Sequence, residues 1–156
     1  MGHPKIEFVD PFPELYLIGD AGHPPCGRRL VVFGRGIEML SESEAQQFAH
    51  RWVQAWNSHD LDAVMSHYAQ GVVLTSPAAA RLLSDPSGTV AGKEAVRSYF
   101  ERGLEAYPNL TFELLDVMWG VSSIVLYYVN QKGTRTAEFM EFDATQKVVR
   151  VVANYT

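Results

Sequence analysis

The sequence predicts an α+β domain preceded by an arm rich in proline and glycine. Residues 41–107 carry apolar stripes with helical spacing, whereas residues 110–155 change to alternating, β-rich segments. Residues 1–40 hold five of the eight prolines and six of the twelve glycines. A chain of 156 residues with 47% apolar content can bury a core without disulfide or metal support.

Residues 1–40 are predicted to form an extended arm, because their proline content excludes a long helix. The arm could lie over the domain or over a partner subunit. Alternatively it is a dispensable leader, with Met39 as a second start. Residues 41–156 form the predicted domain.

Composition excludes several classes of function. The net charge of −5 argues against nucleic acid as a partner, since neutralising phosphates requires a basic face. No apolar run approaches the ~18 residues of a membrane span, and the N-terminus does not have the pattern of a signal peptide. Cys26 has no partner for an internal disulfide. With no zinc spacing or phosphate-binding loop, we expect no metal, no cofactor and a cytoplasmic location.

The first two predicted helices have clear start signals. Ser41 and Glu44 have capping-box spacing, and Asp60 is the best N-cap for the second helix, which runs to Tyr68. A third helix begins at Gly92. We expect burial of the apolar positions of each element: Phe48, Trp52, Val64, Phe100, Met140 and Val151.

The remaining segments predict a short strand, a long loop and an antiparallel meander. The strand over 72–76 ends at Pro77, and the loop spans 77–91. Alternating segments near 110–119, 122–131, 134–143 and 147–155 are joined by short turns, which favours hairpins. We therefore predict three helices packed on one face of a curved antiparallel sheet.

Strand register indicates one candidate catalytic group. If Lys132-Gly133 is a two-residue turn, Tyr127 pairs with Glu138, and both point toward the helices with Met140. Glu138 is then the only carboxylate among apolar neighbours, which raises its pKa as a general acid requires. A one-residue slip would turn it to solvent. His59 and His67 are predicted at the surface.

A family resemblance rests on six short segments: 56–62, Tyr68-Ala69, Ser76-Pro77, 90–96, 139–142 and 147–149. In these segments the chain resembles the nuclear transport factor 2-like superfamily, most closely its SnoaL-like polyketide cyclase and ketosteroid isomerase branch. The resemblance covers about 41–156 and implies a cone-shaped α+β barrel. It also implies that Glu138 stands at the position of the isomerases' protonated oxyanion-hole acid.

The same resemblance places Ser76 at the position of the isomerases' aspartate base and Trp52 at that of their tyrosine. A serine cannot abstract a carbon-bound proton unaided, so steroid isomerisation is not expected. Small-molecule binding remains the expectation. The predicted ligand contacts are Trp52, Trp56, Tyr68, Ser76, Phe100, Tyr127, Met140 and Tyr155.

We therefore expect an apolar cavity that binds a small hydrophobic, carbonyl-bearing molecule. Acid/base catalysis through Glu138, as in an isomerase, cyclase or dehydratase, is one hypothesis. A non-catalytic binding or dimerisation module is the other. A homodimer is expected through the outer sheet face, predicted to carry Leu126, Tyr128, Phe139, Val148 and Val152.

Overall fold

The computed structural model describes residues 40–156, which adopt a mixed α+β fold. The predictions for residues 1–39 fall outside this part of the chain. In chain order the described elements are α1 (Glu42–Asn57), α2 (Leu61–Ser66), β1 (Tyr68–Thr75), α3 (Pro77–Leu83), β2 (Thr89–Ala91), α4 (Lys93–Ala106), β3 (Phe112–Trp119), β4 (Ser123–Asn130), β5 (Arg135–Phe142) and β6 (Val148–Tyr155).

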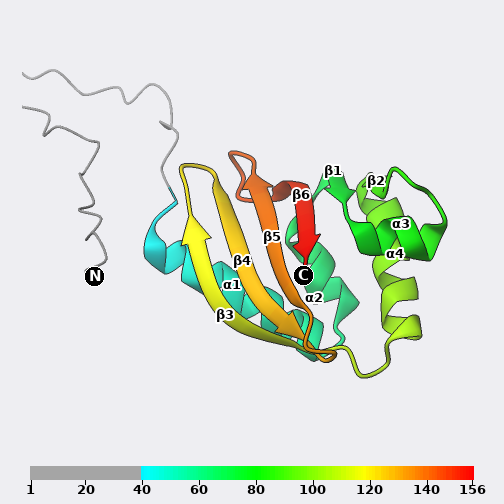
Figure 1. Cartoon of the computed structure of the whole chain (residues 1–156). Helices are drawn as coiled ribbons and strands as arrows, with labels where there is room; N and C mark the ends of the chain where they lie inside the picture. Colours follow the sequence, from blue (N-terminus) through cyan, green and yellow to red (C-terminus); the bar gives the residue numbers. More distant parts are fainter. Residues whose placement is uncertain (1–39) are drawn as a thin grey trace, which may run out of the picture. The chain divides into compact units, whose positions relative to one another are not determined.

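The strands of this region form one curved sheet of six strands in the order β2-β1-β6-β5-β4-β3, so it stays open at β2 and β3 (Figure 1). Strands β3 to β6 form the predicted antiparallel meander. The prediction of a purely antiparallel sheet was wrong, because β1 pairs in parallel with β6. The α+β fold with helices packed on a curved sheet is confirmed.

Both predicted helix starts are confirmed. The backbone amide of Ser41 donates to Glu44 Oε2 at 2.9 Å, and the Ser41 side chain accepts from the Glu44 amide. Asp60 Oδ1 accepts from the Ala63 amide at 2.9 Å and so caps α2. These bonds satisfy amide groups that have no partner inside the helix.

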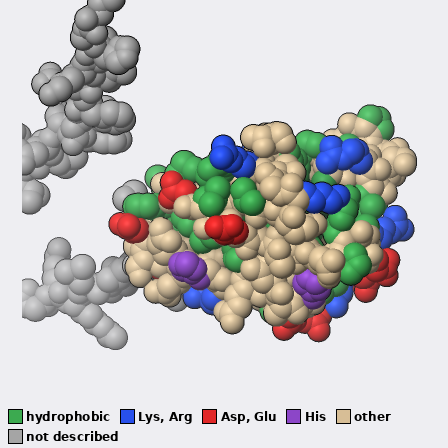
Figure 2. Space-filling view, turned by 60° about the horizontal axis from the view of Figure 1, so that its bottom comes forward, with side chains coloured by type: hydrophobic (Ala, Val, Ile, Leu, Met, Phe, Trp, Pro, Cys, Tyr) green, Lys and Arg blue, Asp and Glu red, His purple; other side chains and the backbone are tan. Residues whose placement is uncertain are grey.

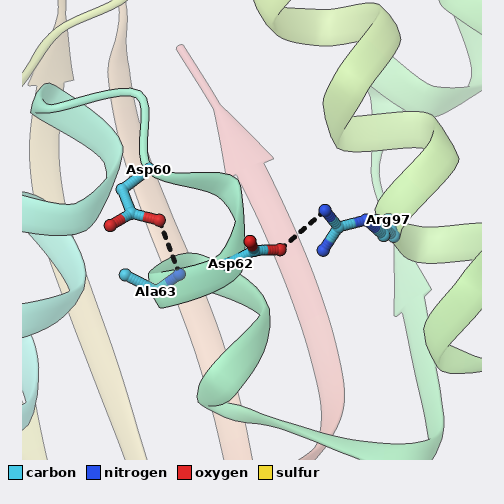
Figure 3. A network of polar contacts seen from close by, with 4 residues as sticks. All are labelled: Asp60, Asp62, Ala63 and Arg97. Carbon is cyan, nitrogen blue, oxygen red and sulfur yellow. Dashed lines mark hydrogen bonds and ion pairs between the residues drawn. The ribbon is translucent and has the colours of Figure 1, made fainter.

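The helices enclose one side of the sheet. Helix α1 lies against its inner face, while α3 and α4 stand beside β1 and β2 (Figure 1). Arg97 on α4 forms an ion pair with Asp62 on α2, with Nη2 2.7 Å from Oδ1 (Figure 3). The predicted burial is confirmed for all six positions, Phe48, Trp52, Val64, Phe100, Met140 and Val151.

Residues 77–91 do not form the predicted long loop, because they contain α3 and β2. Ser76 begins α3: its Oγ accepts from the Ala78 amide at 3.1 Å. Pro77 occupies the first turn, where a missing N–H breaks no intrahelical hydrogen bond. Tyr68, predicted at the end of the second helix, is instead the first residue of β1.

The β4–β5 hairpin differs from the prediction by one residue. Its turn contains three residues, 131–133, with Gly133 at φ 77°. Asn130 organises this turn, since its Oδ1 accepts from the amides of Lys132 and Thr134 at 2.9 and 3.1 Å. The expected two-residue turn was therefore wrong.

Glu138 consequently pairs with Leu126, and Tyr127 pairs with Ala137. Because side chains alternate between faces along a strand, the shift turns Tyr127 to the outer face and brings Tyr128 inside. The prediction that Tyr127 shares a face with Glu138 was wrong, whereas Glu138 itself is on the inner face and buried.

The residues on the outer sheet face also differ from those predicted. Leu126, Tyr128 and Val148 are buried, so their predicted place on that face was wrong. Phe139 and Val152 pair with each other and remain partly exposed. In residues 40–156, no helix has both the length and the apolar character needed to cross a bilayer.

Candidate functional site

A cavity of about 530 Å³ lies between the inner sheet face and helices α1, α3 and α4. Its walls combine aromatic and polar side chains, and small-molecule sites commonly pair apolar walls with polar groups in this way. The lining includes Trp52, Trp56, Ser76, Arg81, Tyr99, Phe100, Tyr107, Phe112, Tyr128, Lys132, Thr136, Glu138 and Tyr155.

The aromatic wall is built by α1, α4 and β3. The Trp56 ring meets the Phe100 ring edge-on at 4.8 Å between centroids, and Trp52 stacks on Phe112 at 5.6 Å with 9° between planes. Trp52 and Trp56 share the wall because their spacing of four residues places them on one side of α1. Such a surface suits a flat or polycyclic apolar molecule.

Among residues 40–156, Glu138 is the only acidic side chain that lines the cavity. Its β-sheet neighbours on the inner face are Leu126 and Ala153, both apolar. The Tyr128 hydroxyl donates to Glu138 Oε2 at 2.6 Å. Burial raises the pKa of Glu138 to about 7, while the Tyr128 hydrogen bond acts in the opposite direction.

Hydroxyl groups occupy another part of the wall. Ser76 Oγ and the Tyr155 hydroxyl lie 3.2 Å apart. Tyr99 lies close to them, and burial raises the pKa of Tyr99 and of Tyr155 above the usual range. These hydroxyls therefore stay neutral at physiological pH, where they can both donate and accept hydrogen bonds.

Two polar atoms of the lining have no hydrogen-bond partner among the described residues. They are Trp56 Nε1 and Thr136 Oγ1, and both side chains are buried. A buried donor without a partner costs about 1–3 kcal/mol. Both atoms are also inaccessible to solvent, so a ligand could reach them only if the surrounding side chains moved.

The structure brings most of the predicted site residues together. Trp52, Trp56, Ser76, Phe100, Glu138 and Tyr155 all line the cavity. The other three predicted contacts, Tyr68, Tyr127 and Met140, do not. Tyr68 is buried beside the wall and accepts a hydrogen bond from Trp52 Nε1 at 2.9 Å. Met140 is fully buried, and Tyr127 lies on the opposite sheet face.

Sequence reasoning missed several lining residues. Tyr128 required the correct hairpin register, for which Asn130 before Gly133 is the available signal. Arg81 required the helix that begins at Ser76-Pro77, a recognisable start pattern. Thr136 follows from the same alternation along β5 that places Glu138 inward, whereas no local sequence signal indicates that Tyr99 faces the cavity.

The two histidines near α2 lie outside this cavity. His59 is exposed, as predicted, and its Nε2 lies 2.9 Å from the Leu110 carbonyl oxygen. His67 was predicted at the surface, but it is only partly exposed, because its ring packs against Phe48. Burial, with a contribution from nearby Arg51, lowers the pKa of His67 to about 4. Within residues 40–156 no three His, Cys, Asp or Glu side chains cluster as a metal site requires.

Comparison with known proteins identifies the family. A family model described as a SnoaL-like domain matches residues 49–156. The chain belongs to this SnoaL-like family. A solved SnoaL-like protein of unknown function from Burkholderia thailandensis is 39% identical, with a TM-score of 0.74 over 76% of this chain and 99% of that one. Among proteins of curated function, none matches this sequence.

Two more distant solved structures share the fold. A candidate SnoaL-like polyketide cyclase from Shewanella denitrificans is 16% identical, with a TM-score of 0.57 over 72% of this chain and 90% of that one. A Mycobacterium tuberculosis protein in complex with estradiol-17beta-hemisuccinate is 17% identical, with a TM-score of 0.57 over 72% and 93%. At these identities the likeness is evidence for the fold alone.

Proposed function

We propose that this SnoaL-like protein binds a small hydrophobic, carbonyl-bearing molecule in the cavity and catalyses proton transfer through Glu138. The observation that carries the proposal is a buried carboxyl group in an aromatic cavity, with its pKa raised to about 7. A group with a pKa near the working pH can act as both acid and base. Isomerisation, cyclisation and dehydration of a carbonyl compound all require this chemistry.

The hydrogen bonding of Glu138 favours a defined role for each oxygen. Tyr128 donates to Oε2, while Oε1 makes no hydrogen bond within the described residues. In the neutral acid the proton therefore belongs on Oε1, where it can be donated to a ligand carbonyl oxygen. In the ionised form the same oxygen can accept a proton from the carbon next to that carbonyl. Tyr128 holds the carboxyl group in one orientation for both steps.

The aromatic wall and the hydroxyl groups of Ser76 and Tyr155 support the binding part of the proposal. The wall suits a polycyclic apolar body, and the two hydroxyls can form a hydrogen bond with a second ligand oxygen. The Mycobacterium tuberculosis protein of the same fold, in complex with estradiol-17beta-hemisuccinate, supports a ligand of this size and character. Figure 2 shows a face on which acidic and basic side chains lie in separate small groups, without the continuous basic surface that nucleic acid requires.

One observation favours a second candidate, a binding protein without catalysis. The hydrogen-bond partner of Glu138 is Tyr128, and burial raises the pKa of Tyr128 well above 10. Tyr128 therefore cannot exchange a proton with Glu138 near neutral pH. In this alternative the neutral carboxyl group is only a hydrogen-bond donor to the ligand.

The two candidates differ in the effect of E138Q. The substrate probe is a β,γ-unsaturated cyclic ketone, whose conversion to the conjugated enone is followed by ultraviolet absorbance. Proton exchange next to the carbonyl in D₂O is followed by NMR. Enzyme action predicts that E138Q lowers both rates by about 10²–10⁴-fold while keeping the affinity. The matched control is E141Q, which changes an outward-facing acid on the same strand.

Each outcome decides between the candidates. Loss of turnover in E138Q, with activity retained in E141Q, supports the enzyme. Ketone binding without turnover or exchange in the unmodified protein supports the binding protein. No binding of the ketone or of a steroid hemisuccinate, measured by quenching of indole fluorescence, would overturn both.

A further inference from the structure

Two cationic side chains stand at the mouth of the cavity. Arg81 comes from α3 and Lys132 from the turn between β4 and β5, so they approach from different elements. Both line the cavity, and both are exposed. The mouth is therefore positive, whereas the acidic side chain of the lining, Glu138, is buried deeper in the wall.

Neither cation is neutralised by an ion pair among residues 40–156. In that part of the chain the ion pair is between Arg97 and Asp62, away from the cavity. Asp85, one turn beyond Arg81, accepts the Ser87 amide at 2.9 Å instead. Arginine in particular is usually found with a carboxylate or phosphate, because its planar donors match two oxygens at once.

Aromatic side chains connect the two cations around the mouth. Lys132 Nζ lies 4.1 Å from the centre of the Tyr107 ring. Tyr99 lies near Tyr107 and also near Arg81: burial raises its pKa, and the Arg81 guanidinium acts in the opposite direction. The ammonium of Lys132 is thus held over an aromatic face at the entrance.

We propose that the ligand is an amphipathic acid, with an apolar body in the aromatic cavity and a carboxylate held at the mouth by Arg81 and Lys132. This inference rests on the proposed function of the same cavity and adds the class of its ligand. The arrangement also fixes the direction of entry. A carboxylate placed at depth would meet the acid Glu138 in an apolar wall, which is costly, so the apolar end enters first.

The test compares an acid with its neutral ester. Pyrenebutyrate and its methyl ester have the same apolar body, and binding of either is followed by energy transfer from the protein indoles to pyrene. We expect the acid to bind about five- to tenfold more tightly, because each exposed ion pair contributes at most about fivefold. R81Q and K132Q should each reduce this preference, and the double variant should remove it.

The matched control is R102Q/R150Q, which removes the same net charge from exposed positions outside the lining. It should keep the preference for the acid. Added salt should weaken binding of the acid and leave binding of the ester unchanged.

Equal affinities for acid and ester in the unmodified protein would overturn the anion site and leave the proposed function standing. A preference that survives in R81Q/K132Q would also overturn it. Conversely, a preference for the acid together with no proton transfer to or from the ketone probe would support the anion site and contradict catalysis. If neither pyrene compound binds, the anion site is overturned as well.

Discussion

Glu138 is a titratable residue in a largely apolar part of the core. It is buried among apolar neighbours, and the hydrogen bond from Tyr128 offsets only part of the loss of hydration. Removing an ionised carboxylate from water is expensive, so the folded state favours the neutral acid. The raised pKa of Glu138 therefore also makes the stability of the fold depend on pH.

The first stability prediction follows from the direction of this shift. The pKa of Glu138 rises from 4.5 to about 7 on folding, so between these values the unfolded chain loses the proton that the folded protein keeps. The contribution of Glu138 to the free energy of unfolding is fully present below pH 4.5 and lost as the pH rises through 7. Over this range it falls by about 3 kcal/mol.

His67 acts in the opposite direction, since burial lowers its pKa from 6.5 to about 4. Between these values the unfolded chain binds the extra proton, and the stability of the folded state rises with pH. The effect of Glu138 must therefore be measured as the difference in unfolding free energy between a variant and the unmodified protein. In urea unfolding, E138Q should gain about 3 kcal/mol relative to the unmodified protein between pH 4.5 and 8. The free energy of unfolding of E141Q should change with pH as that of the unmodified protein does. If the same is true of E138Q, the raised pKa of Glu138 is contradicted.

At the scale of single elements, the register of one hairpin separates what the sequence could and could not predict. The alternation in β5 predicted correctly that Glu138 and Met140 point inward. The register of the partner strand β4 was predicted one residue off, because the turn has three residues and not two. Its inward-facing and outward-facing residues were therefore exchanged. One turn residue therefore decides whether Tyr127 or Tyr128 reaches the acid.

Helix α3 depends on Gly88, a residue outside the helix. Gly88 has φ 58°, and its carbonyl oxygen accepts from the Ser76 amide at 2.9 Å. A Cβ added at Gly88 would lie 2.6 Å from the Ser76 carbonyl oxygen, a backbone atom that cannot move freely. Ser76 begins α3, so a shift there displaces the helix that carries Arg81.

We therefore expect G88A to lower the free energy of unfolding by about 1–3 kcal/mol, through backbone strain and close contact. It should also weaken the preference for pyrenebutyrate over its ester. The control is G71A, whose Cβ would meet no atom within 4 Å. Urea unfolding measures both, and a G88A protein as stable as G71A would show that α3 tolerates the shift.

At the scale of the whole molecule, the outer sheet face has an apolar centre. Val125, Phe139 and Val152 form one row across β4, β5 and β6, with Tyr127 beside it, and all four are partly exposed. Charged residues flank the row, as Glu141 pairs with Arg150 across β5 and β6. An apolar centre with a polar edge is the composition of a protein interface.

We propose that two copies associate through this face to form a homodimer. The protein should show a dimeric mass at micromolar concentration by light scattering after size-exclusion chromatography. F139K should produce monomers, because it places an ammonium group in the apolar centre. A144K, in an exposed turn, is the control and should remain dimeric. A monomeric mass for the unmodified protein would exclude the dimer.

The fold as a whole was more predictable than its strand partners. Capping signals and apolar spacing are local, so they identify helices and the four-stranded meander directly. The parallel pairing of β1 with β6 leaves no such signal, since the two strands are joined by the rest of the sheet and two helices. The cavity wall at Ala153 and Tyr155 depends on that pairing.

The late position of β6 in the chain has a consequence for biosynthesis. This strand lies between β1 and β5, yet it is made after both. A ribosome adds roughly 5–20 residues per second, so β1 waits for seconds with one row of backbone amides and carbonyls open to other chains. Tyr155 and Thr156, the last lining residues in chain order, join the cavity wall only after the other strands have been made. The complete ligand site therefore forms only when β6 enters the sheet.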